Sequence, residues 1–393
     1  MEIKWLNWSK FFLTAYLLYT YVFRQTLFPI PVISYLLLPA AVICFLLFRQ
    51  EIKLDSFLKA LILYTVYCTV SGFLLAKDTA VLLRACKNLA LYTVVFWLTF
   101  EYSLEDKSID FAERVLFMWT LSYTVMILLF GVGSERVSIA ENVNVNGISR
   151  TMVFAIGLKL YQFTKGNRSR WQTIIAIVEI VLFLYVIAIT VSKMAIICVL
   201  LLLLFWVLFC SAEASRDTLL KKLLFLIAAV AVATGLFIYF KTRFPERYAF
   251  ILYRMSGLTG SNSSIKRWRL IKEALAVFSE HPLFGVGLNN FRFHTPLETY
   301  SHCLYTEVLS CTGTVGALMI FPAMGLLLVN LFRKVRSAPD ETKRKQALLI
   351  LFMYVLLLCI SFVQIVIYST HLMFVLAIIN AAVYTELDKD GSR

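Results

Sequence analysis

A succession of apolar runs, each about long enough to cross a bilayer as a helix, constrains this chain more than any other feature. A spanning helix needs roughly 20 apolar residues. Charged residues make up only 16% of the chain, against about 25% in soluble proteins. We therefore predict an all-α, polytopic membrane protein with about twelve transmembrane helices. The runs lie at residues 11–23, 28–48, 56–76, 82–100, 111–131, 144–163, 172–191, 193–211, 222–240, 303–331, 347–367 and 369–386.

The distribution of basic residues predicts the orientation of these spans. Lys and Arg collect in cytoplasmic loops, and an even number of spans puts the most basic connections on one side. These connections lie at residues 49–59, 165–170, 216–222 and 333–345. Both termini are then expected in the cytoplasm. The chain would divide into residues 1–240 with helices 1 to 9, an extracytoplasmic loop at 241–302, and residues 303–393 with helices 10 to 12 and a short cytoplasmic tail.

The long loop at 241–302 carries a cationic surplus that topology does not explain. The chain has a net charge of +14, and the positive-inside bias accounts for most of it without nucleic acid as a partner, but it weakens for loops of roughly 60 residues. One interpretation is a solvated amphipathic helix at about 264–279. Its apolar face would hold Trp268, Ile271, Leu275 and Phe278. The other interpretation is a site for a phosphate or diphosphate, because guanidinium groups bind phosphate oxygens bidentately.

Two motifs follow this helix. Residues 281–287 read HPLFGVG, and residues 301–307 read SHCLYTE at the start of the tenth run. Together they resemble the O-antigen ligase and polymerase superfamily, whose members show an arginine, a helix, a P-L-x-G-x-G turn, and an H-N-x-Y-x-E element leading into a Gly-rich helix. Arg267 stands where the family arginine is expected, and Gly313 and Gly316 supply the later glycines. The resemblance covers residues 254–319, with Cys303 in place of the usual asparagine.

This resemblance implies a GT-C-like, inverting glycosyltransferase that needs no metal or other cofactor. Its donor would be a glycan on undecaprenyl diphosphate. Its acceptor would be a lipid-linked repeat unit, for a polymerase, or a lipid A-core sugar, for a ligase. We favour the polymerase slightly, because nothing in the chain points to lipid A-core. The implied location is the bacterial cytoplasmic membrane, in contact with its lipids, with the active site facing outward.

The reaction assigns a role to each candidate residue. His302 would engage the acceptor hydroxyl and Arg267 would hold the leaving diphosphate, both as catalytic residues. The further diphosphate ligands would be Arg254, Arg269, Arg84 and Arg150, and the supporting residues Glu307, Tyr305, Gly285 and Gly287. The glycine turn would bring Arg267 towards His302, and we expect the Glu307 carboxylate to pair with an arginine such as Arg267.

Structural roles could explain the same residues. A histidine at a membrane boundary can bond a loop carbonyl, Arg84 and Arg150 can extend to the interface, and Tyr305 can anchor it. A twelve-span transporter or flippase is an alternative function, although we see no repeat between the halves and no charge cluster at mid-membrane depth. A non-catalytic scaffold of the cell envelope is a third.

Overall fold

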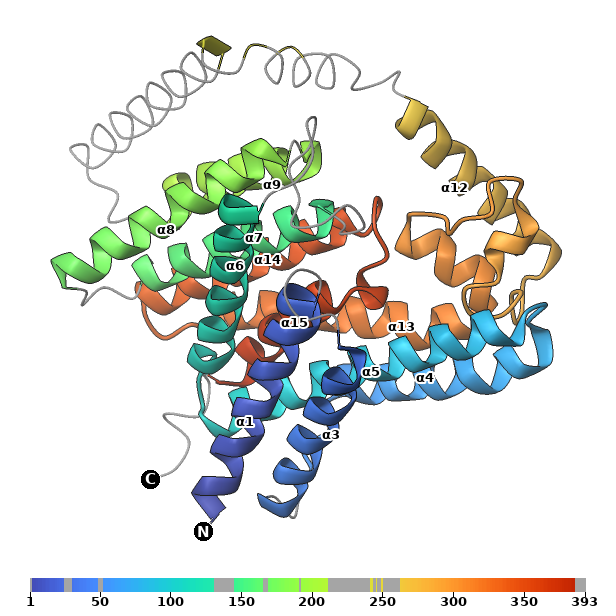
Figure 1. The fold of residues 1–393 in the computed structure, drawn as a ribbon, viewed down its shortest axis with the longest axis horizontal. Coiled ribbons are helices and arrows are strands. Elements are labelled where there is room, and N and C mark those ends of the chain that lie inside the picture. The colour runs from blue at the N-terminus through green and yellow to red at the C-terminus, as the bar shows by residue number, and fades with distance from the viewer. Residues whose placement is uncertain are drawn as a thin grey trace.

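The computed structural model describes residues 2–24, 30–48, 52–130, 145–164, 169–190, 192–210, 241–242, 245, 249 and 262–385. In these residues every regular element is a helix (Figure 1). The long helices are α1 (Glu2–Leu18), α3 (Pro31–Phe48), α4 (Ser56–Leu75), α5 (Thr79–Glu105), α6 (Asp110–Phe130), α7 (Val145–Thr164), α8 (Arg170–Ile189), α9 (Lys193–Phe205), α12 (Asn262–Glu280), α13 (Leu304–Arg336), α14 (Glu341–Ile360) and α15 (Thr370–Thr385). Short π- or 3-10 segments are η1 (Tyr19–Phe23), η2 (Trp206–Cys210), η3 (Phe291–His294) and η4 (Val366–Tyr368).

The predicted apolar runs coincide with these helices. Every run has its helix except 222–240, which lies outside the described residues. Six helices in the described part are long and apolar enough to cross a membrane: α4, α5, α6, α8, α9 with η2, and α13. The protein is thus a polytopic helical membrane protein, and the count of twelve spans and the GT-C-like character stay predictions.

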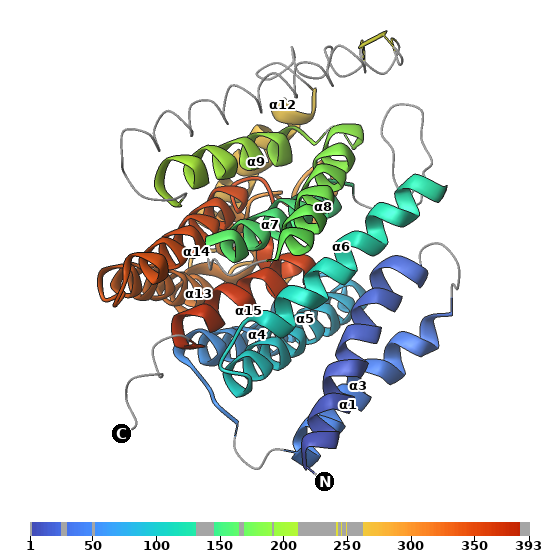
Figure 2. The same cartoon turned by 90° about the vertical axis from the view of Figure 1, so that its left-hand side faces the viewer.

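The helices form a bundle around α13 and α15. Helix α13 packs against α4, α14 and α12, and α15 packs against α5 and α7. Helices α1 and α3 form a pair at the edge of the bundle, beside α6 (Figure 2). Helix α12 packs against one end of α13 (Figure 1). Arg267 lies on α12, and His302 lies in the loop just before α13, which we call the His302 loop.

Polar contacts fix several helix ends. The Asp55 side chain caps α4 by accepting from the Leu58 backbone N–H at 2.9 Å, and it also accepts from Asn380 Nδ2 at 2.9 Å. One carboxylate therefore starts α4 and ties it to α15. Between α7 and α8, Lys159 Nζ lies 2.6 Å from Glu179 Oε2, a pairing that offsets the cost of burying both charges.

The loop at residues 281–303 docks into a break in α13. Gly313 has φ 63° and ψ −165°, so α13 is interrupted there, although the sequence predicts one unbroken span. The Gly287 N–H donates to the Cys311 carbonyl at 2.9 Å, and the Thr314 N–H donates to the Pro282 carbonyl at 2.8 Å. The broken helix thus exchanges backbone hydrogen bonds with the turn.

The turn is the tight one that the glycine spacing predicts. Gly285 and Gly287 have φ of 70° and 93°, a region that glycine enters without steric cost. A Cβ at Gly285 would lie 2.4 Å from the Cys311 carbonyl carbon. Only glycine allows the turn to approach α13 this closely.

Candidate active site

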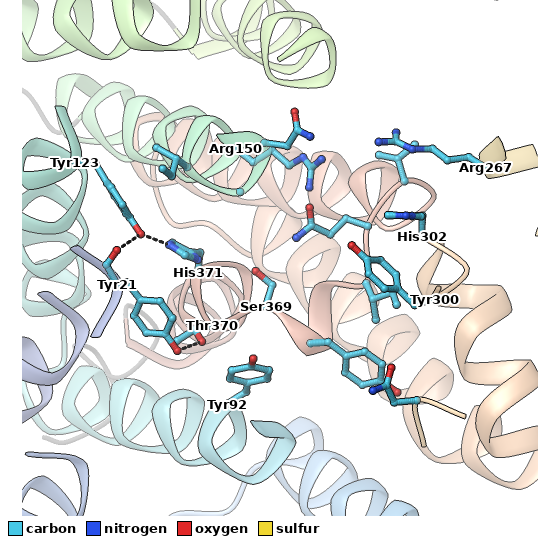
Figure 3. Close-up of a pocket in the computed structure, with 18 residues that line it drawn as sticks. Tyr21, Tyr92, Tyr123, Arg150, Arg267, Tyr300, His302, Ser369, Thr370 and His371 are labelled. Atoms are coloured by element: carbon cyan, nitrogen blue, oxygen red, sulfur yellow. Dashed lines mark hydrogen bonds between the residues drawn. The ribbon is translucent and has the colours of Figure 1, made fainter. Parts of the chain in front are cut away.

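A cavity of about 440 Å³ lies where the start of α7, α12, the His302 loop and the start of α15 meet (Figure 3). Its lining comprises Tyr21, Tyr92, Tyr123, Asn146, Gly147, Ile148, Arg150, Arg267, Asn289, Tyr300, His302, Val363, Gln364, Ile365, Tyr368, Ser369, Thr370 and His371. The volume lies within the roughly 300–1,000 Å³ of small-molecule sites. Among the described residues that line the cavity there is no carboxylate, so the described lining offers an anion positive charge from its arginines.

Arg267 reaches the cavity because of how α12 is buried. The helix buries Leu270, Ala274 and Val277 against the turn and α13. This corrects the predicted face: Trp268 is 65% exposed and Leu275 45%. The small Ala274 side chain allows the close approach to the turn, whereas the bulkier face stays at the surface. In this register the Arg267 guanidinium points into the cavity (Figure 3).

Arg150 approaches from the other side. It lies in the second turn of α7, is 3% exposed, and extends into the same cavity (Figure 3). Burying an arginine at such a position costs free energy unless its charge is paired or binds a ligand. Together, Arg150 and Arg267 give the cavity a cationic end.

His302 lies beneath Arg267 at this cationic end (Figure 3). Its backbone has φ 60°, which is unusual for a residue with a side chain. Its ring lies 4.1 Å from the Tyr300 ring, centroid to centroid. Burial, together with the charges of Arg267 and Arg150, lowers the pKa of His302 to about 4. The imidazole is therefore neutral at pH 7 and able to accept a proton.

Glu307 fixes the loop that bears His302. The carboxylate is fully buried and accepts from the Ser301 backbone N–H at 2.7 Å, and the Cys311 Sγ lies 3.6 Å from its other oxygen. The Ser301 hydroxyl donates to the Cys303 carbonyl at 2.9 Å, and the Leu304 N–H donates to the Ser361 carbonyl at 2.8 Å. The expected pairing of Glu307 with Arg267 is not seen among the described residues: the Ser301 N–H and the Cys311 thiol contact the carboxylate, and Arg292 is the arginine whose charge acts on it.

Three other predicted residues, Arg269, Arg84 and Tyr305, do not line the cavity. Arg269 pairs with Glu273 at 2.7 Å on the exposed side of α12, and Arg84 is exposed on α5. Tyr305 donates to the Leu358 carbonyl at 3.1 Å and contacts Phe362. Arg254 lies outside the described residues.

The sequence did not single out several lining residues. They are Tyr21, Tyr92, Tyr123, Tyr300, Gln364, Ser369 and His371. They come from η1, α5, α6, the loop at residues 281–303, the connection around residue 368 and the start of α15, and no local pattern links them. For metals, the described ranges hold no group of three or more His, Cys, Asp or Glu side chains that could bind an ion.

Part of this cavity lies within a match to a known protein family. Residues 178–321 match the family model described as O-antigen ligase. Over these residues the chain is similar to that family. This confirms the resemblance to the O-antigen ligase and polymerase superfamily. The match contains Arg267, the glycine turn and His302, whereas Arg150 lies before it. No curated protein matches the chain.

Proposed function

We propose that this protein transfers a glycan from undecaprenyl diphosphate to an acceptor hydroxyl at the outer face of the bacterial cytoplasmic membrane. The observation that carries the proposal is that Arg150, Arg267 and His302 line one cavity whose described lining residues include no carboxylate. Such an arrangement suits an anionic leaving group beside a proton acceptor. The O-antigen ligase match supports the same class of reaction.

The residues divide the reaction between them. The acceptor oxygen forms a bond to the anomeric carbon while the bond from that carbon to the diphosphate breaks. The electron pair goes to the diphosphate oxygen, where Arg267 and Arg150 stabilise the charge. The proton of the acceptor hydroxyl passes to the neutral His302 ring. A single displacement of this kind inverts the anomeric centre.

The arginines also tune the base. Burial and the charges of Arg267 and Arg150 hold the pKa of His302 at about 4. A bound diphosphate would oppose these charges, so the pKa would rise towards its ordinary value of about 6.5. His302 would thus become an effective base when the donor is in place.

The predicted topology agrees with an outward-facing site. With twelve spans and cytoplasmic termini, the ends of α1 and α6 and the starts of α7, α13 and α15 all fall on the outer side. These helix ends, or the segments next to them, contribute Tyr21, Tyr123, Arg150, His302 and His371 to the cavity.

Reconstituted transfer tests the proposal. The full chain in proteoliposomes receives an undecaprenyl-diphosphate oligosaccharide, with and without lipid A-core. We expect a ladder of longer lipid-linked glycans without core, as for a polymerase. Transfer that occurs only with core would make the protein a ligase. Absence of donor consumption in both would contradict the proposal.

Three variants separate the enzyme from a transporter. His302→Ala should lower transfer about a hundredfold or more, as for loss of a general base, and Arg267→Ala should weaken donor binding. Arg344→Ala is a matched control, because Arg344 is exposed on α14 and near Glu341. Glycan flux that falls in step with transfer in His302→Ala would favour the transporter instead.

A further inference from the structure

The cavity has a second end with different chemistry. Opposite Arg267 and His302 lie Tyr21, Tyr123, Thr370 and His371, and Tyr92 and Ser369 lie nearby (Figure 3). We call these six residues the neutral end. Hydroxyl groups and aromatic rings predominate in it, and it contains no Lys, Arg, Asp or Glu.

The neutral end is held in place by its own contacts. The Tyr123 hydroxyl donates to the Tyr21 backbone carbonyl at 2.7 Å and lies 3.1 Å from His371 Nε2. The Tyr21 hydroxyl is hydrogen-bonded to the Thr370 hydroxyl. The His371 ring stacks on Trp119 with centroids 4.3 Å apart. Groups fixed in this way lose little conformational entropy when a ligand binds.

These contacts determine which groups are left for a ligand. The single Tyr123 proton goes to the Tyr21 carbonyl, so His371 Nε2 must carry the proton in its contact with Tyr123. His371 Nδ1 is then an acceptor, and it has no partner among the described residues. The Ser369 hydroxyl likewise has no side-chain partner in the part of the chain that the structure describes. The neutral end thus offers an acceptor, a hydroxyl and aromatic surface.

This combination excludes two ligand classes and fits a third. An anion would need the arginines of the other end. A polyprenyl chain would need apolar walls, and burying hydroxyl groups against it would cost free energy. A sugar ring presents C–H groups to aromatic rings and hydroxyls to polar groups, as ligand sites with a few placed polar groups require.

We propose that the neutral end binds an uncharged sugar ring of a glycan substrate while the cationic end holds the diphosphate. This inference rests on the proposed function and deepens it. It predicts that recognition of the glycan and recognition of the lipid diphosphate depend on different residues of one cavity. The ring belongs either to the donor or to the acceptor, and kinetics distinguish the two.

The test is equilibrium binding to the full-length chain in nanodiscs with two probes. One is bare undecaprenyl diphosphate, and the other is the free repeat-unit oligosaccharide released from its carrier. Tyr92→Leu and Ser369→Val should each weaken oligosaccharide binding about tenfold and leave carrier binding within about twofold. Arg267→Ala should do the reverse. Tyr185→Leu is the matched control, because Tyr185 is 45% exposed on α8 and outside the cavity.

Each outcome has one meaning. An oligosaccharide affinity that is unchanged in both Tyr92→Leu and Ser369→Val overturns the inference. An equal loss of affinity for bare undecaprenyl diphosphate in either variant also overturns it. Oligosaccharide binding that depends on Tyr92 in a protein without transfer activity would refute the proposed function and keep the subsite. If the protein is active, Tyr92→Leu should raise one of the two Michaelis constants. A rise for the donor assigns the bound sugar ring to the donor, and a rise for the acceptor assigns it to the acceptor.

Discussion

Replacement of Glu307 by Ala tests how His302 is held in its geometry. The Glu307 carboxylate accepts from the Ser301 N–H at 2.7 Å, and Ser301 is fully buried. Removing the acceptor leaves that N–H without a partner, which costs about 1–3 kcal/mol. The next residue, His302, is in the left-handed region with φ 60°, so the loop has less strained alternatives. If the loop relaxes, the active geometry is populated roughly 5- to 150-fold less.

The assay is kcat/KM for glycan transfer, with the thermal midpoint measured in parallel. We expect Glu307→Ala to lose kcat/KM by that factor. Glu307→Gln keeps one acceptor oxygen for the Ser301 N–H and should lose much less. Neither variant alters Arg267 or Arg150, so binding of bare undecaprenyl diphosphate should stay within about twofold of the wild type. Wild-type kcat/KM in a folded Glu307→Ala protein would refute the reasoning.

Three further predictions follow from the site. Gly285→Ala should reduce stability and transfer together, because a left-handed alanine costs about 1–2 kcal/mol and its Cβ would meet the Cys311 backbone at 2.4 Å; Gly325→Ala, with no atom within 4 Å, is the control, and equal thermal midpoints would contradict the argument. The value of kcat/KM should fall on the acid side near pH 4, where His302 of the free enzyme becomes protonated. Arg267→Gln removes a positive charge beside His302, so this fall should occur at a higher pH, and the rate should be lower throughout. An unchanged pH dependence in Arg267→Gln would argue that Arg267 and His302 are not close to each other. Transfer should be unchanged in EDTA, because guanidinium groups would neutralise the diphosphate; loss of turnover that a divalent cation restores would overturn this expectation.

The sequence was most informative where chemistry is local. The apolar runs predicted the helices, because backbone N–H and C=O groups inside a membrane must be hydrogen-bonded within the chain, as they are in a helix. The spacing of Gly285 and Gly287 gave the turn, because positive φ favours glycine. The surplus of arginines and the motif around His302 identified two residues that share a cavity although 35 positions separate them, from 267 to 302.

Tertiary packing decided the rest. The face of α12 was predicted from its bulky residues, yet the small Ala274 determines which side approaches the turn. Glu307 was expected beside an arginine such as Arg267, but its carboxylate accepts from the Ser301 N–H of its own loop, and the arginine whose charge acts on it is Arg292. The break at Gly313 depends on hydrogen bonds from a distant loop. The neutral end gathers side chains from four separate segments, and no spacing in the sequence connects them.

The central claim is that Arg267 and His302 face one cavity that receives a lipid diphosphate. The chain has only 4 histidines, so NMR of histidine-labelled protein in nanodiscs, with His302→Gln for assignment, can follow the His302 imidazole directly. The account predicts a pKa near 4 in the free protein, a higher pKa in Arg267→Gln, and a higher pKa when undecaprenyl diphosphate is added to the wild type. A His302 pKa near the ordinary value of about 6.5 that responds neither to the substitution nor to the carrier would contradict it.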